Sequence, residues 1–241
     1  MKTFVYLTLC VSIMFAAKLS FAAAEIQLVS EENPPFNYTD EKSGKFIGIE
    51  TEMVEKVFKR AGVKYSMTSM PWLRAYNSAL GENNTCVFMT AQTGERLPIF
   101  KWVGPFLDVE WVVYQKKGVD LKVSSIEDLK KLRVGGYFGD GPVVFLQGKG
   151  VEMDLVQNDA LNPKKLEKGR IDAWVTNSVR GPLLAKKQGV TELKKLLSLK
   201  VITHFVACNK GVADSTIEAL NREVKKLKAS GFIEDMNKPR G

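Results

Sequence analysis

Residues 78–96, SALGENNTCVFMTAQTGER, and residues 165–181, KLEKGRIDAWVTNSVRG, follow the same pattern. Each begins with the end of a helix-like segment, which is followed by a glycine, an apolar, strand-like run and a polar loop. The same alternation runs through the rest of the chain, for example at residues 49–62, where apolar side chains recur at helical spacing and a glycine follows. Strands that alternate with helices predict an α/β fold with largely parallel sheets, arranged here as two similar lobes.

The two polar loops are the first places where we expect function, because ligands of open α/β sheets bind just beyond the carboxyl ends of the strands. The first loop, residues 90–96, contains Thr90, Thr93 and Arg96. A fixed guanidinium at Arg96 could hold a carboxylate through two parallel hydrogen bonds, although a surface arginine paired with a nearby acid explains the spacing equally well. The second loop begins at the end of the apolar run 171–175 and contains Asn177.

Aromatic and charged residues elsewhere give further candidates for a small-molecule cleft, which typically combines aromatic walls with a few polar anchors. Phe36, Tyr38 and Trp72 are the aromatic candidates, although each taken singly is more often a packing residue. Arg74 is a weaker candidate for an anionic ligand. Asp140 lies in a glycine-rich turn whose backbone N–H groups could face an anion at the start of the following helix.

The N-terminal segment predicts export. Lys2 is followed by an apolar stretch over residues 4–17 and by three alanines before Glu25, which is typical of a secretory signal peptide over residues 1–24. The exact cleavage site stays open. No later segment reaches the roughly 18 apolar residues that a membrane helix needs, so we expect a soluble, exported mature chain.

Composition excludes several classes of function. The formal net charge is +8, but lysines are interspersed with acids, as in residues 192–195, which is typical of a solvated surface and does not indicate nucleic-acid binding. The single histidine, His204, lies in an apolar run; it argues against a multi-histidine zinc site and is interpreted as a packed strand residue. We expect no metal, no cofactor and no catalytic residue. Cys86 and Cys208 could form a disulfide after export or remain buried thiols.

Five segments in order then resemble the family 3 extracellular solute-binding proteins, the periplasmic receptors typified by polar amino-acid ABC transport systems. They are PPFNYTDEKSGKFIGIETEMVEKVFKRAGV (34–63), MPWLRAYNSAL (70–80), TGERLPIFKWVGPF (93–106), SSIEDLKKLRVGGYFGDGP (124–142) and LEKGRIDAWVTNS (166–178). No single motif is decisive, but their order and spacing are specific, and together they span most of the chain after the signal peptide.

The resemblance implies a type II periplasmic-binding fold, in which two lobes joined by two crossover strands close on a ligand like a hinge. It places lobe 1 at residues 25–110 and 205–241 and lobe 2 at residues 111–204, with crossovers near 109–115 and 204–209. Phe36 would supply an aromatic ring and the Thr93 to Arg96 motif a carboxylate grip. The implied function is periplasmic capture of a small polar or anionic solute by a monomer that delivers it to a membrane permease.

Asn177 departs from the pattern of the family, whose amino-acid-binding members usually have an aspartate there to hold the ammonium group of the ligand. A neutral amide cannot form that charge-assisted bond, so the sequence predicts a solute without a standard α-ammonium group. Two other functions stay open. The chain could be a sensor that reports its ligand to a membrane receptor, or a dehydratase-like enzyme on the same fold, for which Asp140 or Glu95 would be the general acid.

Overall fold

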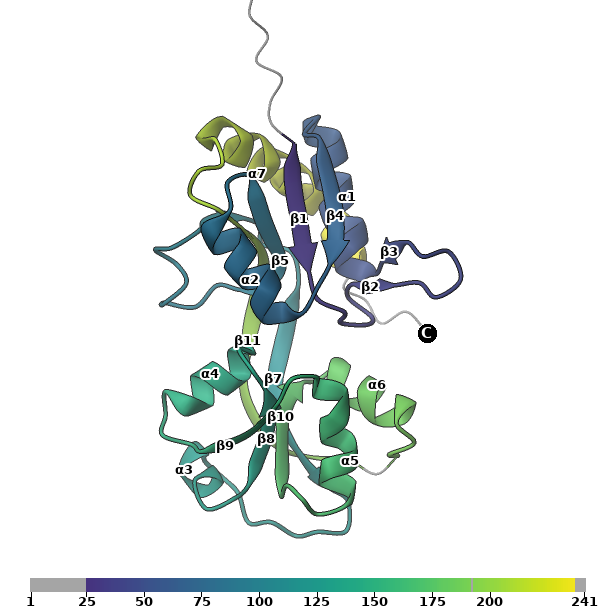
Figure 1. Cartoon of the computed structure of the whole chain (residues 1–241), viewed down its shortest axis with the longest axis vertical. Coiled ribbons are helices and arrows are strands. Elements are labelled where there is room, and N and C mark those ends of the chain that lie inside the picture. Colours follow the sequence, from purple (N-terminus) through teal and green to yellow (C-terminus); the bar gives the residue numbers. More distant parts are fainter. Residues whose placement is uncertain (1–24, 192, 237–241) are drawn as a thin grey trace, which may run out of the picture.

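The computed structural model describes residues 25–191 and 193–236, so the predicted signal peptide lies outside the described residues. Two groups of helices and strands, which we name the first and second lobe, are joined by the long strands β7 (Asp108–Lys116) and β11 (Leu193–Cys208) (Figure 1). None of the helices in residues 25–191 and 193–236 has both the length and the apolar character that a membrane span requires. This architecture confirms the predicted α/β, two-lobe type II fold.

The first lobe is built on β1 (Ile26–Ser30), which pairs in parallel with β4 (Tyr65–Ser69) on one side and with β5 (Thr85–Ala91) on the other. The carboxyl ends of these strands face the second lobe (Figure 1). The remaining elements of this lobe are β2 (Tyr38–Thr39), β3 (Phe46–Ile47), β6 (Lys101–Val103), α1 (Ile49–Ala61), α2 (Trp72–Gly81), α7 (Asp214–Ala229) and α8 (Phe232–Met236).

The second lobe repeats the arrangement with a shorter parallel core, in which β8 (Val134–Tyr137) lies between β9 (Met153–Val156) and β10 (Ala173–Asn177). Trp174 on β10 is fully buried at the centre of this lobe. The helices of the lobe are α3 (Ile126–Leu129), α4 (Gly141–Gln147), the 3₁₀ turn η1 (Asp159–Leu161), α5 (Asn162–Glu167) and α6 (Arg180–Lys187).

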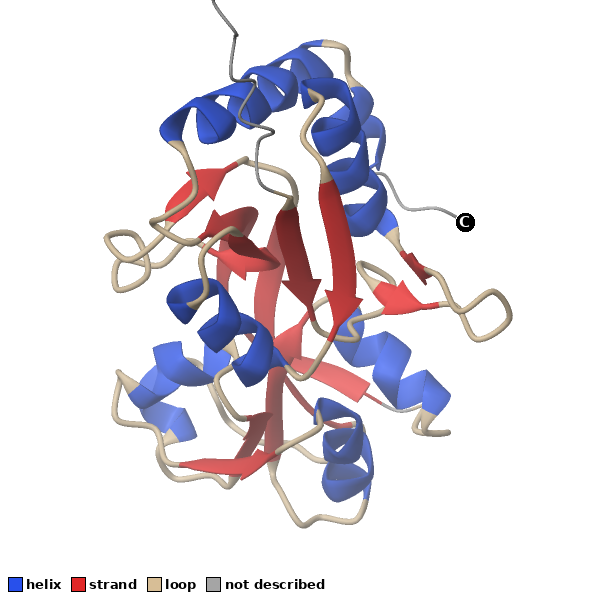
Figure 2. Ribbon diagram, turned by 45° about the horizontal axis from the view of Figure 1, so that its top comes forward, coloured by secondary structure: helices blue, strands red, loops and turns tan. Residues whose placement is uncertain are grey.

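The two crossover strands make one continuous connection between the lobes (Figure 2). They pair with each other antiparallel from Leu193↔Lys116 to Thr203↔Asp108; beyond this, β11 continues into the first lobe and pairs with β5, while β7 also pairs with β10 in the second lobe. Because both connections are strands rather than mobile loops, the relative movement of the lobes is restricted to bending about this pair.

The first lobe is closed by a disulfide that the sequence left undecided. Cys86 on β5 and Cys208 on β11 are directly opposite each other in the antiparallel register and are bonded, with S–S 2.09 Å. Both residues are completely buried within the apolar core of the lobe, together with Leu28, Phe58 and Phe88. The bond therefore ties the returning strand β11 to the sheet on which the first lobe is built.

Candidate functional site

The candidate site is a small cavity between the lobes, about 30 Å³ in volume. Both lobes and both crossover strands contribute to its wall, which consists of Glu31, Asn33, Trp72, Met89, Ala91, Arg96, Trp111, Tyr137, Asp140, Gly141, Pro142, Asn177, Arg180 and His204. A space of this size holds little more than a water molecule, whereas cavities that enclose small organic ligands measure hundreds of cubic ångströms. The two lobes therefore lie close together around the cavity, and we describe this arrangement as closed.

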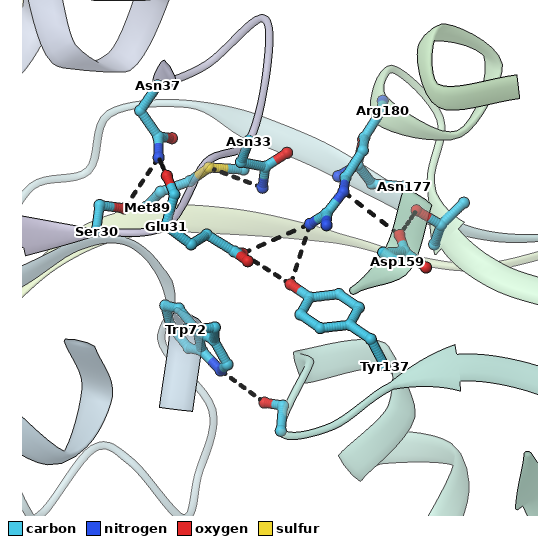
Figure 3. Close-up of polar contacts among 12 residues, drawn as sticks. Ser30, Glu31, Asn33, Asn37, Trp72, Met89, Tyr137, Asp159, Asn177 and Arg180 are labelled. Atoms are coloured by element: carbon cyan, nitrogen blue, oxygen red, sulfur yellow. Dashed lines mark hydrogen bonds and ion pairs between the residues drawn. The ribbon is translucent and has the colours of Figure 1, made fainter. Parts of the chain in front are cut away.

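The structure brings four of the nine predicted site residues to this cavity: Trp72 and Arg96 from the first lobe, and Asp140 and Asn177 from the second. Trp72 begins α2 and donates its indole N–H to the carbonyl oxygen of Gly139 in the second lobe, at 2.8 Å (Figure 3). Gly139 has φ +77°, and a Cβ there would lie 2.3 Å from a Leu73 methyl group, so a glycine is needed for this approach.

The other five predicted residues lie elsewhere. Phe36 is buried, its ring perpendicular to that of His204, and with Tyr38 it lines a separate cavity of about 780 Å³ beside α1. Thr90 is buried and donates its hydroxyl to the carbonyl oxygen of Val87. Arg74 is exposed on α2, and Thr93 lines a hollow on the surface behind Arg96.

Arg96 is buried, with 8 % of its surface exposed, and its guanidinium lies over the rings of Trp72 and Tyr76, 5.5 and 5.2 Å from their centroids. Its hydrogen bonds are long: 3.4 Å to the carbonyl oxygen of Ala91 and 3.5 Å to that of Gly139. Within residues 25–191 and 193–236 no carboxylate pairs with it. A buried cation held only by aromatic faces and distant carbonyls is suited to an incoming anion.

A cluster of charged residues that the sequence did not single out spans the cleft (Figure 3). Glu31, at the end of β1, accepts a hydrogen bond from the Tyr137 hydroxyl at 2.7 Å. Arg180, at the start of α6, donates to that hydroxyl at 3.0 Å and lies 3.5 Å from Glu31 and 3.4 Å from Asp159. Glu31 precedes the Pro-Pro loop, and Arg180 follows the loop that contains Asn177. Both residues therefore lie next to motifs that the sequence did single out.

Burial of this cluster shifts the titration of its acids. Burial raises the pKa of Asp140 to about 8 and, against the attraction of Arg180, also raises the pKa of Glu31. Burial also raises the pKa of the Tyr137 hydroxyl well above its usual value. At neutral pH the Asp140 side chain in the closed cleft is thus mainly the uncharged acid.

Asp140→Asn is expected to stabilise the closed protein increasingly as pH rises. In the folded wild type the carboxyl keeps its proton up to pH 8 or so, whereas in the unfolded chain it ionises near pH ~3.9. The folded state thus binds more protons between these limits, and its stability falls as pH rises through them. Asparagine removes this loss. The difference in unfolding midpoint between variant and wild type should therefore increase by several degrees, in favour of the variant, from pH ~5 to pH ~8. A constant difference between variant and wild type would contradict the buried, protonated Asp140.

Asn177 has a structural partner on its own loop. Its Oδ1 accepts hydrogen bonds from the backbone N–H groups of Val179, at 3.1 Å, and Arg180, at 2.7 Å. The side chain thereby holds the turn that leads from β10 into α6 and positions Arg180 beside the cluster. An amide oxygen committed to two backbone donors offers the cavity no negative charge.

His204 is a packed strand residue, as the sequence predicted, and it also reaches the cavity. It is buried on β11, but its ring lines the cavity, and its Nδ1 lies 3.1 Å from Oε2 of Glu50, a completely buried residue in the first turn of α1. The sequence did not suggest this pair because 154 positions separate the two residues.

Comparison with known proteins adds to this picture. The chain is similar to solved structures of an ancestral arginine-binding protein bound to arginine (23% identity, 88% of this chain and 96% of the other, TM-score 0.75) and of the substrate-binding protein of an amino acid ABC transporter (21%, 88% and 97%, 0.71). It is also similar to a histidine kinase sensor domain with similarity to periplasmic binding proteins (16%, 88% and 93%, 0.79). None of the curated proteins compared with it matches. The family described as bacterial extracellular solute-binding proteins, family 3, matches residues 26–239. The chain therefore belongs to the family 3 bacterial extracellular solute-binding proteins.

Proposed function

We propose that this protein captures a small solute bearing a carboxylate in the periplasm and presents it to an ABC-type permease. The observation that carries the proposal is the Arg96 guanidinium, which is buried, opens on the cavity between the lobes and has no carboxylate partner in the described residues. A carboxylate on the solute would supply the missing charge through two parallel hydrogen bonds. The solute would then lie in the cavity beside Arg96, whose guanidinium is held over the aromatic ring of Trp72.

Export, the removal of residues 1–24 and a monomeric state belong to the same proposal. So do the boundaries that assign residues 25–110 and 205–241 to lobe 1 and residues 111–204 to lobe 2. The strands β7 and β11 that connect the lobes support a hinge in this region. Closure would then be a shift of population between open and closed forms, driven by contacts that the solute makes with both lobes.

A sensor that reports its solute to a membrane receptor is the second candidate, because the histidine kinase sensor domain is similar over 88% of this chain. Transport and sensing need the same cleft, so its geometry does not separate them. Neighbouring genes would separate transport from sensing. Genes for a permease and an ATPase favour transport, and a lone sensor-kinase gene favours sensing.

An enzymatic role is the weaker alternative. Asp140 meets one requirement of a general acid, since it lines the cavity and burial raises its pKa to about 8, but Glu95 is exposed and lies outside the cavity. Buried charge clusters without catalysis shift pKa values in the same way. We expect no turnover of prephenate-like acids. If these acids were converted with loss of water and carbon dioxide, the enzymatic role would be favoured.

A thermal-shift screen of the chain without residues 1–24 tests the proposed function. The panel holds amino acids, their deaminated carboxylate analogues, small sugars and short peptides. A ligand at about 100 times its dissociation constant adds roughly 2.7 kcal/mol to the free energy of unfolding, which raises the midpoint by several degrees. We expect carboxylates to raise it. Shifts by sugars alone, or by none of the compounds with a carboxyl group, would contradict the proposal.

A further inference from the structure

Beside Arg96, two residues with hydrogen-bond acceptors, Asn33 of the first lobe and His204 of β11, line the same cavity. Ala91, at the end of β5, connects them to the guanidinium: its carbonyl oxygen accepts the Arg96 hydrogen bond, and it pairs with His204 in the register of β5 and β11. Asn33 reaches the same strand two residues earlier, at Met89. These contacts place Asn33, His204 and Arg96 around the same end of β5.

Asn33 offers an oxygen. Its amide Nδ2 donates to the sulfur of Met89 at 3.2 Å, and because a thioether accepts but never donates, this contact fixes which way the amide points. Its Oδ1 is buried and has no hydrogen-bond partner in the described residues, although the side chain lines the cavity (Figure 3). Met89 itself has φ +60°, which is unusual for any residue other than glycine. The backbone thus holds an unfavourable conformation where it meets Asn33.

His204 offers a nitrogen. A carboxylate oxygen of Glu50 faces its Nδ1, so this nitrogen carries the hydrogen, and in the neutral imidazole Nε2 is then an acceptor. Nε2 makes no hydrogen bond within residues 25–191 and 193–236, while the ring lines the cavity. Glu50 is a positioning residue: it fixes the tautomer and the direction of the ring from within the core of the first lobe.

We propose that the solute is a small α-hydroxy acid, whose carboxylate binds Arg96 and whose hydroxyl donates to Nε2 of His204, with Oδ1 of Asn33 as the neighbouring acceptor. This rests on the proposed function, because it takes the acid at Arg96 as given. Within the part of the chain that the structure describes, the subsite explains two features that a carboxylate grip alone does not. The amide oxygen of Asn33 has no partner there, and the buried Glu50 side chain has a hydrogen bond to His204, the single histidine of the chain.

An α-amino acid fits this wall less well, because an ammonium group needs a negative charge and neither the Asn33 amide nor the His204 imidazole supplies one. The acids nearby do not supply one. Glu31 is already bonded to Tyr137 and lies beside Arg180, and burial raises the pKa of Asp140 to about 8, so it is mainly uncharged at neutral pH. Asn177 is neutral, and two backbone amides occupy its oxygen.

The test compares acids that differ only at the α carbon: lactate, alanine and propanoate, and malate, aspartate and succinate. Dissociation constants are measured by calorimetry for wild type, His204→Asn, Asn33→Leu and Arg96→Gln. His204→Asn keeps an N–H for Glu50 but lacks Nε2, whereas Asn33→Leu removes the orphan oxygen at similar volume. Thermal unfolding of each variant checks that it folds. Because His204 and Asn33 lie on different segments of the chain, one of these two variants still tests the subsite if the other does not fold.

In at least one series we expect wild type to bind the hydroxy acid about tenfold more tightly than the acid without the hydroxyl. His204→Asn should reduce this ratio to near one while leaving the binding of the plain acid unchanged, and Asn33→Leu should reduce it partly. A preference for the amino acid, no preference, or a preference that survives both substitutions would overturn the hydroxyl subsite alone. If no acid binds wild type more tightly than it binds Arg96→Gln, the proposed function fails and the subsite with it.

Discussion

Arg96→Gln is expected to weaken the binding of a carboxylate solute by about 100-fold or more. Removing one partner of a buried, hydrogen-bonded charge pair costs about 2–5 kcal/mol, much of it because the other charge is left buried and unpaired. Glutamine keeps a polar side chain of similar length at this position but loses the charge and the paired N–H donors that match a carboxylate. Calorimetry with the acid that gives the largest thermal shift measures the change in dissociation constant.

Arg74→Gln is the matched control. It makes the same chemical change two residues after Trp72, but Arg74 is exposed on α2 and does not line the cavity. The dissociation constant of this variant should stay within about twofold of wild type, since Arg74 does not contact the cavity and salt screens exposed charges. Equal losses in both variants would mean that the guanidinium at residue 96 acts through the overall charge of the protein and makes no specific contact.

Loss of the Cys86–Cys208 disulfide is expected to lower the free energy of unfolding by about 3–5 kcal/mol. The bond joins residues 122 positions apart, and a cross-link over so long a loop removes much of the conformational freedom of the unfolded chain. This is a large fraction of the 5–15 kcal/mol that stabilises a typical protein. Urea unfolding followed by tryptophan fluorescence, with and without a reductant, measures the change.

The double variant Cys86→Ala/Cys208→Ala provides the control for the reductant. The third cysteine of the chain, Cys10, lies in the predicted signal peptide, so the exported form would contain no other thiol. Reductant should lower the unfolding midpoint of wild type to near that of the double variant and leave the variant unchanged. A wild-type midpoint that does not respond to reductant would show that the bond does not restrain the unfolded chain.

The general fold was predictable from the sequence because it depends on local patterns. Apolar runs and glycines at the ends of helices marked the strands of both lobes, and the order of five motifs indicated the two crossover strands. The length of β11 was not predicted, since its first half, from Leu193, is partly exposed and its leucines are mixed with lysines without a regular alternation. Its pairing with β7 makes it a strand, and a partner strand is not visible in a local window.

The candidate site was only partly predictable, for a related reason. Arg96 and Trp72 follow strands directly, so their place at the cleft could be inferred from strand ends alone. Glu31 of the first lobe meets Tyr137 and Arg180 of the second only where the lobes come together, and Glu50 contacts a residue 154 positions away, His204. The disulfide was undecided for the same reason, because nothing near Cys86 or Cys208 in the sequence shows that β5 and β11 are neighbours.

The most direct measurement compares one acid with its own primary amide on the wild-type protein by calorimetry. The amide keeps the shape of the carboxylate but loses its charge and replaces one acceptor oxygen with an N–H donor, and no change in the protein complicates the result. Since a hydrogen bond between charged groups is about twice as strong as a neutral one, and Arg96 would be left buried without a counter-charge, the amide should bind at least about 30-fold more weakly. Equal affinity for the acid and the amide would show that the solute does not neutralise Arg96 and would contradict the carboxylate grip.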